Sequence, residues 1–269
     1  ADFVVNRIAR LYPAYLVAML LTLSIEYLAH ATQLLVGPVA ILANMTMLQG
    51  FAFLPEVDGA YWTLTVEIAF YFCMISLWKF AGTRRLEPLL AGWLLLRWLY
   101  WFWPDMPERI IMLLVLRYTP FFVIGMLAYR CWRGERSLAQ QAPYAALALL
   151  SIATMETWDV TLVGCVLLAT FVALINGRLR FLRLKPLIWL GGISYSFYLI
   201  HQHVGFVIML ELAKAGYSPW IGFATAFAVA LLLVPSMGNH GLWISLLVSF
   251  VVRGITLGLR YPALERAAG

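Results

Sequence analysis

The sequence has 269 residues, of which 63% are hydrophobic and only 12% are charged, whereas an ordinary soluble domain carries about 25% charged residues. This composition excludes a typical water-soluble globule. The net charge of +6 does not indicate a nucleic-acid partner, because Lys and Arg gather in the connections between apolar stretches, as in the cytoplasmic loops of membrane proteins. The three cysteines have no metal-binding or disulfide spacing, so we expect neither a metal site nor a disulfide framework.

The apolar stretches are about as long as a helix must be to cross a hydrocarbon core. In chain order, we expect them at 11–32, 61–80, 89–103, 110–129, 141–156, 160–176, 186–210, 218–236 and 242–259. A broken stretch between the first two contains several Gly and Pro residues and no Lys or Arg. The sequence therefore predicts an all-α membrane protein, a bundle of about 8–9 transmembrane helices with short loops.

Basic residues alternate between the connections. They precede the first segment and follow the second, fourth and sixth, whereas the other connections hold only Arg109 and Lys214 as cations. Because cytoplasmic loops are enriched in Lys and Arg, we expect a multi-pass protein of a bacterial-type inner membrane, with the N-terminus of this chain in the cytoplasm. The alternation fails only at the end, where Arg260 and Arg266 would lie outside.

Ionisable side chains inside apolar segments commonly mark a functional interior. Glu67 and Tyr71 are four residues apart and share a helix face; Glu67 is either a site residue or a structural partner of a neighbouring Arg. Arg117 precedes Gly125 by two turns on one face, and the small Gly125 would permit a close helix approach. Arg97 lies among tryptophans, where cation–π contact or snorkelling accounts for it.

A third polar face lies in the seventh segment. Ser194, Tyr198 and His201 are spaced i, i+4, i+7 and align, whereas His203 points roughly the opposite way. A lone His is more often structural than catalytic, but the aligned Ser and Tyr favour a site.

Four strings resemble the acyltransferase 3 family of membrane-bound O-acyltransferases: RIARLYPAYL, YWTLTVEIAFYF, RYTPFFVIGMLAY and ISYSFYLIH, in this order over residues 1–232. The resemblance implies a bundle of about ten transmembrane helices that transfers an acyl group, as in O-acetylation, to a sugar of the cell envelope or another polysaccharide. Arg7 and Arg10 are one turn apart, so they can bind a phosphate together; the alternative is that they only mark the cytoplasmic end of the first membrane span. By resemblance they match the R-x-x-R motif that handles the acyl-CoA donor.

The other strings carry further family positions. Trp62 and Glu67 match the W-S-L-x-V-E segment, with Thr in place of both serines. Ser194, Tyr195 and His201 match the S-Y-S-x-Y-L-x-H segment.

These assignments give one candidate site. Its residues are Glu67 and His201 as catalytic groups, Arg7 and Arg10 for the donor, and Trp62, Arg117, Ser194, Tyr195 and Tyr198 shaping the pocket. The expected partners are acyl-CoA as a co-substrate, a carbohydrate or glycolipid acceptor, and the bilayer, with no bound cofactor.

Two departures qualify the resemblance. By resemblance, the family's opening helices carry an Arg and a His that serves as general base; this chain shows no counterpart, so we expect a truncated enzyme that does not turn over. Residues 233–269 read as a divergent segment with a final hydrophobic helix, similar over a short stretch to the end of multidrug-and-toxin-extrusion transporters. The alternatives are a multi-spanning transporter and a catalytically dead membrane fragment.

Overall fold

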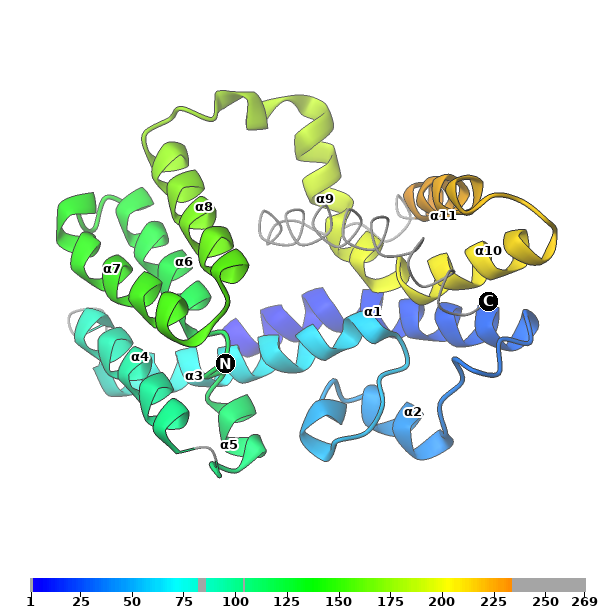
Figure 1. Ribbon diagram of the computed structural model, residues 1–269, viewed down its shortest axis with the longest axis horizontal. Helices are drawn as coiled ribbons and strands as arrows, with labels where there is room; N and C mark the ends of the chain where they lie inside the picture. Colours follow the sequence, from blue (N-terminus) through cyan, green and yellow to red (C-terminus); the bar gives the residue numbers. More distant parts are fainter. Residues whose placement is uncertain (1, 82–85, 104, 234–269) are drawn as a thin grey trace. The chain divides into compact units, whose positions relative to one another are not determined.

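A computed structural model describes residues 2–81, 86–103 and 105–233 (Figure 1). Every regular element in these ranges is a helix, so the all-α prediction is confirmed. The chain divides into two compact units, residues 1–35 with 183–269, and residues 36–182. The expected segment 242–259, and with it nearly all of the divergent C-terminal stretch, lies outside the described residues.

The first unit is built on one long helix. Its elements are α1 (Asp2–Leu28), α9 (Lys185–Ile200), α10 (His203–Lys214) and α11 (Pro219–Leu233). α1 packs against α9 and α10, and α10 packs against α11. The buried side chains of α1 recur at helical spacing and form a stripe of Leu11, Tyr15, Ala18, Met19, Thr22 and Glu26, so one face of this helix supplies the core of the unit.

The second unit contains the remaining elements. They are α2 (Pro38–Asn44), the 3₁₀ turns η1 (Gln49–Ala52) and η2 (Gly59–Tyr61), α3 (Trp62–Ala81), α4 (Leu86–Phe102), α5 (Glu108–Leu113), α6 (Thr119–Trp132), α7 (Leu138–Met155) and α8 (Trp158–Ile175); η3 (Arg180–Arg183) lies at the boundary between the units. The core forms mainly where α7 packs against α4, α6 and α8. At Gly164 an added Cβ would lie 2.8 Å from the Ile152 side chain, so α7 and α8 approach each other closely.

Local sequence sets several helix boundaries. Pro38 and Pro120 lie in the first turns of α2 and α6, where a missing N–H costs nothing. Ser137 and Gln140 form a capping box at the start of α7, which satisfies two backbone N–H groups. Gly134 follows α6 with a φ of +72°, the left-handed conformation that commonly ends a helix.

A buried charged cluster joins three helices of the second unit at one end. The Glu87 carboxylate on α4 accepts hydrogen bonds from Arg130 at 2.7 Å, Arg136 at 3.0 Å and Gln141 at 3.0 Å. Burial by itself raises the pKa of the Glu87 carboxyl, but the hydrogen bonds that it accepts and the charge of Arg130 lower this pKa below its usual value. The cluster therefore holds α4, α6 and α7 together through an ionised carboxylate.

The structural role expected for Arg97 is confirmed, but its side chain is buried and does not snorkel to the surface. Only 1% of its surface is exposed. Its guanidinium donates to the carbonyl and hydroxyl oxygens of Ser151 at 2.7 and 2.9 Å and pairs with Glu156. A buried guanidinium needs such partners because an unpaired buried charge is strongly destabilising; Arg97 thus ties α4 to the end of α7.

Three helices in the described residues are long and apolar enough to cross a membrane, at Leu11–Leu28, Gly59–Leu77 and Trp158–Ile175. A fourth span results if Ser194–Ile200 and His203–Lys214, which are bent by 54°, count as one. The expected 8–9 transmembrane helices are therefore not confirmed. Among the described helices, α6 has 14 residues and falls short of the length that a membrane span needs.

Two of the expected segments are each broken into two helices. The segment 186–210 is broken at His201–Gln202, between α9 and α10, and the segment 110–129 is broken between α5 and α6. In the second break, Val115 adopts a left-handed φ of +54°, which ends the helical path of α5. The first expected segment agrees with the structure: the candidate span begins at Leu11, and Arg7 and Arg10 lie before it in the first turns of the same helix, α1.

Candidate functional site

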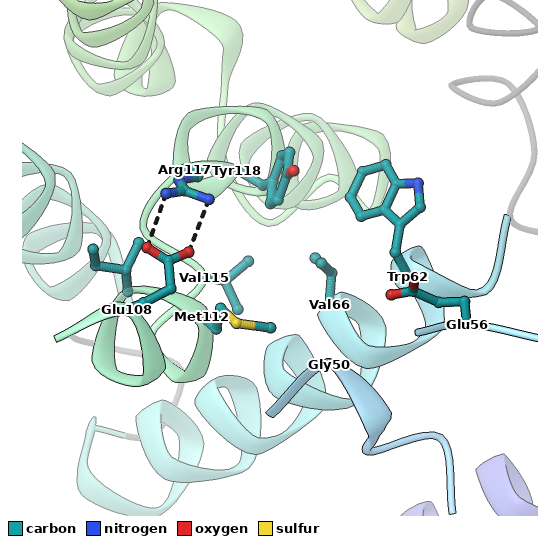
Figure 2. Close-up of a pocket in the computed structure, with 10 residues that line it drawn as sticks. Gly50, Glu56, Trp62, Val66, Glu108, Met112, Val115, Arg117 and Tyr118 are labelled. Atoms are coloured by element: carbon teal, nitrogen blue, oxygen red, sulfur yellow. Dashed lines mark hydrogen bonds and ion pairs between the residues drawn. The ribbon is translucent and has the colours of Figure 1, made fainter. Parts of the chain in front are cut away.

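The second unit contains a pocket where its α3 and α5 helices meet two connecting segments (Figure 2). The cavity has a volume of about 130 Å³ and is lined by Gly50, Glu56, Trp62, Val66, Glu108, Ile111, Met112, Val115, Arg117 and Tyr118. Two residues that the sequence assigned to pocket-shaping, Trp62 and Arg117, lie in it together. Its floor is apolar and its charged groups are few, which is the usual composition of a small-molecule site.

One side of the pocket is the connection between α2 and α3, and Asn44 fixes its shape. The Asn44 side-chain amide donates to the carbonyl oxygens of Ala40 at 2.8 Å and Pro55 at 3.0 Å. Its carbonyl oxygen accepts from the Val57 amide at 3.1 Å. Asn44 and Val57 are fully buried, so this clamp holds both chain neighbours of Glu56 and thereby sets the position of that carboxylate.

The opposite side of the pocket is the turn between α5 and α6. Trp93 donates from Nε1 to the Leu114 carbonyl at 2.7 Å, and the Cys73 thiol donates to the Leu113 carbonyl at 3.2 Å. The Thr119 hydroxyl donates to the Val115 carbonyl at 2.9 Å. Carbonyls at a helix end lack partners within the helix, so these side chains satisfy them and fix the turn that carries Arg117.

Arg117 pairs with Glu108 through two parallel contacts of 2.9 Å (Figure 2), a bidentate geometry that holds both groups in one orientation. The neighbouring Tyr118 ring lies 5.6 Å from the Trp62 ring. The expected face shared by Arg117 and Gly125 is not observed, because Arg117 lies in the turn before α6. Gly125 is not at a close helix contact either, since a Cβ placed there would meet no atom within 4 Å.

Glu67 does not line the pocket, although it lies on the same helix as Trp62. Its carboxylate accepts a hydrogen bond from the Tyr71 hydroxyl, so the predicted common face of these two residues is confirmed. A carboxylate and a phenol in contact can share or relay a proton.

The first unit gathers the remaining motif residues. The Tyr195 hydroxyl on α9 donates to the Leu11 carbonyl on α1 at 3.1 Å, and the Ser194 hydroxyl donates to the Gly191 carbonyl at 2.7 Å. The His201 Nδ1 lies 2.7 Å from the Tyr198 carbonyl oxygen, and the His201 ring stacks on Phe197. Leu11 directly follows Arg10, so the helix of the R-x-x-R motif and the helix of the S-Y-S motif are joined.

The sequence model of one family, described as an acyltransferase domain, matches residues 1–237. The chain belongs to the acyltransferase 3 family. No curated protein and no solved structure gave a match. Together with the candidate spans, the family makes this chain a membrane protein of the acyltransferase class.

Sequence reasoning about this acyltransferase missed two acidic groups of the pocket, Glu56 and Glu108. Both lie in connecting or short helical segments, and no regular spacing joins either of them to Trp62 or Arg117. The sequence signal for Glu56 was the absence of Lys and Arg from residues 33–60, which left its charge uncompensated in its own segment; Glu108 had no such signal.

A second missed feature is a buried acid–histidine pair in the first unit. The Glu26 carboxylate on α1 lies 2.6 Å from Nδ1 of His203 at the start of α10, and Glu26 is 1% exposed. The second oxygen of Glu26 and the Thr22 hydroxyl are buried without a hydrogen-bond partner among the described residues. In those residues, no group of three His, Cys, Asp or Glu side chains has the geometry of a metal site.

Proposed function

We propose that this acyltransferase transfers an acyl group from acyl-CoA to a hydroxyl of a carbohydrate or a cell-envelope glycan at a bacterial-type inner membrane. The observation that carries the proposal is the hydrogen bond from Tyr195 to the Leu11 carbonyl. It joins the two motif helices of the first unit, so the arginine pair of α1 and the polar face of α9 belong to one packed structure.

Arg7 and Arg10 are the donor-binding groups in this proposal. They lie three residues apart within the first third of α1, and residues three apart are neighbours on a helix surface. The diphosphate and phosphate groups of CoA carry several negative charges, and a guanidinium fork binds a phosphate bidentately. The pair therefore suits the nucleotide end of acyl-CoA at the cytoplasmic end of α1.

The acceptor oxygen attacks the thioester carbonyl and forms an ester while the carbon–sulfur bond to CoA breaks; the acceptor hydroxyl loses a proton, and the departing CoA thiolate takes one up. When His201 donates from Nδ1 to the Tyr198 carbonyl, the neutral imidazole carries its lone pair on Nε2. This tautomer is the one that accepts a proton at Nε2; the Tyr198 ring lies beside the imidazole, and Ser194 and Tyr195 are the other proposed pocket-shaping residues of α9. Glu67, in contact with Tyr71, is the second proposed proton-transfer group.

The test is donor binding and acyl transfer by the purified chain in lipid nanodiscs, with radiolabelled acetyl-CoA and a bacterial glycan fraction as acceptor. Arg10→Lys keeps the charge but loses the fork, so its affinity for acetyl-CoA should fall about tenfold. The matched control is Arg133→Lys, at an exposed position of the second unit, which should bind the donor like the wild type. Unchanged donor affinity in both Arg7→Lys and Arg10→Lys would remove the arginine pair from the site.

A further inference from the structure

The charges of the pocket in the second unit do not balance. Three charged residues line it, Glu56, Glu108 and Arg117. Arg117 and Glu108 neutralise each other through their bidentate contact. Glu56 has no ion pair within the described part of the chain, and its side chain is only partly buried. The pocket therefore carries a net charge of about −1 that resides on Glu56.

The shape of the pocket suits a ring. Its volume of about 130 Å³ is close to that of an engineered cavity of about 150 Å³ that holds benzene. Figure 2 shows the Arg117–Glu108 pair on one side and Trp62 with Glu56 on the other, with Val66, Val115 and Met112 between them. A ligand that fits must present an apolar face to this floor and polar groups to both sides.

Carboxylates restrict those polar groups to donors, because an ionised carboxylate only accepts hydrogen bonds. A pyranose ring meets both requirements, since it has a face of C–H bonds for the Trp62 and Val66 side chains and a rim of hydroxyl donors for the two carboxylates. A planar aromatic ligand would contact the floor but would leave the carboxylates without donors, which is unfavourable when they are desolvated.

The same geometry disfavours an anionic sugar. The guanidinium of Arg117 is already engaged by Glu108, so a carboxylate on the ligand would meet the charge of Glu56 without a compensating cation. Two negative charges repel each other, and the repulsion is stronger in a site that is partly shielded from water. An amine on the ring would instead gain a charged partner in Glu56.

We propose that this pocket is the acceptor subsite, that it holds a neutral or amine-bearing pyranose ring, and that Glu56 excludes uronic acids. The proposal rests on the proposed function for the role of the sugar as acyl acceptor. The pocket lies between the connections 33–60 and 103–109, which the charge pattern places on the outer side of the membrane. An acceptor of the cell envelope would arrive from that side.

Saturation-transfer NMR on the full chain in nanodiscs tests the proposal with three probes: methyl β-glucopyranoside, glucosamine below the pKa of its amine, and glucuronate. The wild type should bind glucosamine most tightly, bind the glucoside, and bind glucuronate at least about tenfold more weakly than glucosamine. Glu56→Gln should remove this preference and leave the three affinities within about threefold of one another. Trp62→Leu should weaken all three probes.

The matched control is Glu211→Gln, which removes an exposed carboxylate of the first unit and should leave the order of affinities unchanged. Equal binding of glucuronate and glucosamine by the wild type, or no binding of any probe, would overturn the proposal. Acetyl-CoA binding is measured on the same samples. Normal acetyl-CoA binding together with equal affinities for the three sugars refutes the acceptor subsite alone. Unchanged acetyl-CoA affinity in both Arg7→Lys and Arg10→Lys refutes the proposed function.

Discussion

Asn44 should control the local stability of the loop that carries Glu56. Asn44→Leu keeps the approximate volume of the side chain but removes the two hydrogen bonds donated to Ala40 and Pro55 and the one accepted from Val57. The Val57 amide is buried, so water cannot replace its lost partner without opening the loop.

The magnitude follows from the bonds that are lost. A buried N–H left without a partner costs roughly 1–3 kcal/mol, and each neutral hydrogen bond contributes about 1 kcal/mol. For the Val57 amide and the partly buried Pro55 carbonyl together, we expect a loss of about 2–4 kcal/mol of local stability. At about 1.4 kcal/mol per factor of ten, the Val57 amide should exchange its hydrogen about 30- to 1000-fold faster.

Hydrogen exchange followed by mass spectrometry measures this loss on a peptide that covers residues 45–57. Asn176→Leu is the control, because Asn176 is exposed and its side chain donates to the Val172 carbonyl of its own helix; hydrogen exchange and thermal stability of this variant should stay near those of the wild type. Sugar affinity should fall with Asn44→Leu, since Glu56 lies next to the loosened Val57. If the Val57 amide of Asn44→Leu exchanged its hydrogen at the wild-type rate, the Asn44 hydrogen bonds would not be what holds the loop.

Three further predictions concern stability and orientation. The pKa of Glu87 is lowered in the folded state, so the stability that its ionised carboxylate contributes is present above the unfolded-state pKa and is lost as the pH falls through the folded-state pKa. The melting temperature of the wild type should therefore fall in acid by more than that of Glu87→Gln. A double-mutant cycle of Glu26→Gln and His203→Asn should give a coupling of about 1–3 kcal/mol, and additive effects would contradict the buried pair. A cysteine at Pro55 should react with an impermeant reagent from outside intact cells and one at Gly134 should not; the reverse would invert the orientation.

The sequence predicted the features of this protein that depend on local composition. Helical structure and membrane insertion follow from the length and hydropathy of apolar stretches, and the family follows from four short strings. The shared face of Glu67 and Tyr71 was also predictable, because a four-residue spacing fixes the direction of two side chains on one helix.

The sequence pattern did not predict where the helices break. Only a few polar residues interrupt the long apolar runs at His201–Gln202 and at the turn 114–118, so the apolar pattern marks neither break. In the second case the break depends on side chains from other helices, such as Trp93 and Cys73, which satisfy the carbonyls of the turn. The position of Arg117 depends on this turn, and so its partner Glu108 was not expected.

The sequence by itself determined the class of the protein, its helical character and the identity of its motifs. Only the tertiary structure decided which polar groups pair: Arg97 with Glu156, Glu26 with His203, and Asn44 with the backbone around Glu56. No local sequence spacing encodes these pairings. Each buried polar group needs a hydrogen-bond partner, and the packing of distant segments decides which group comes within about 3 Å.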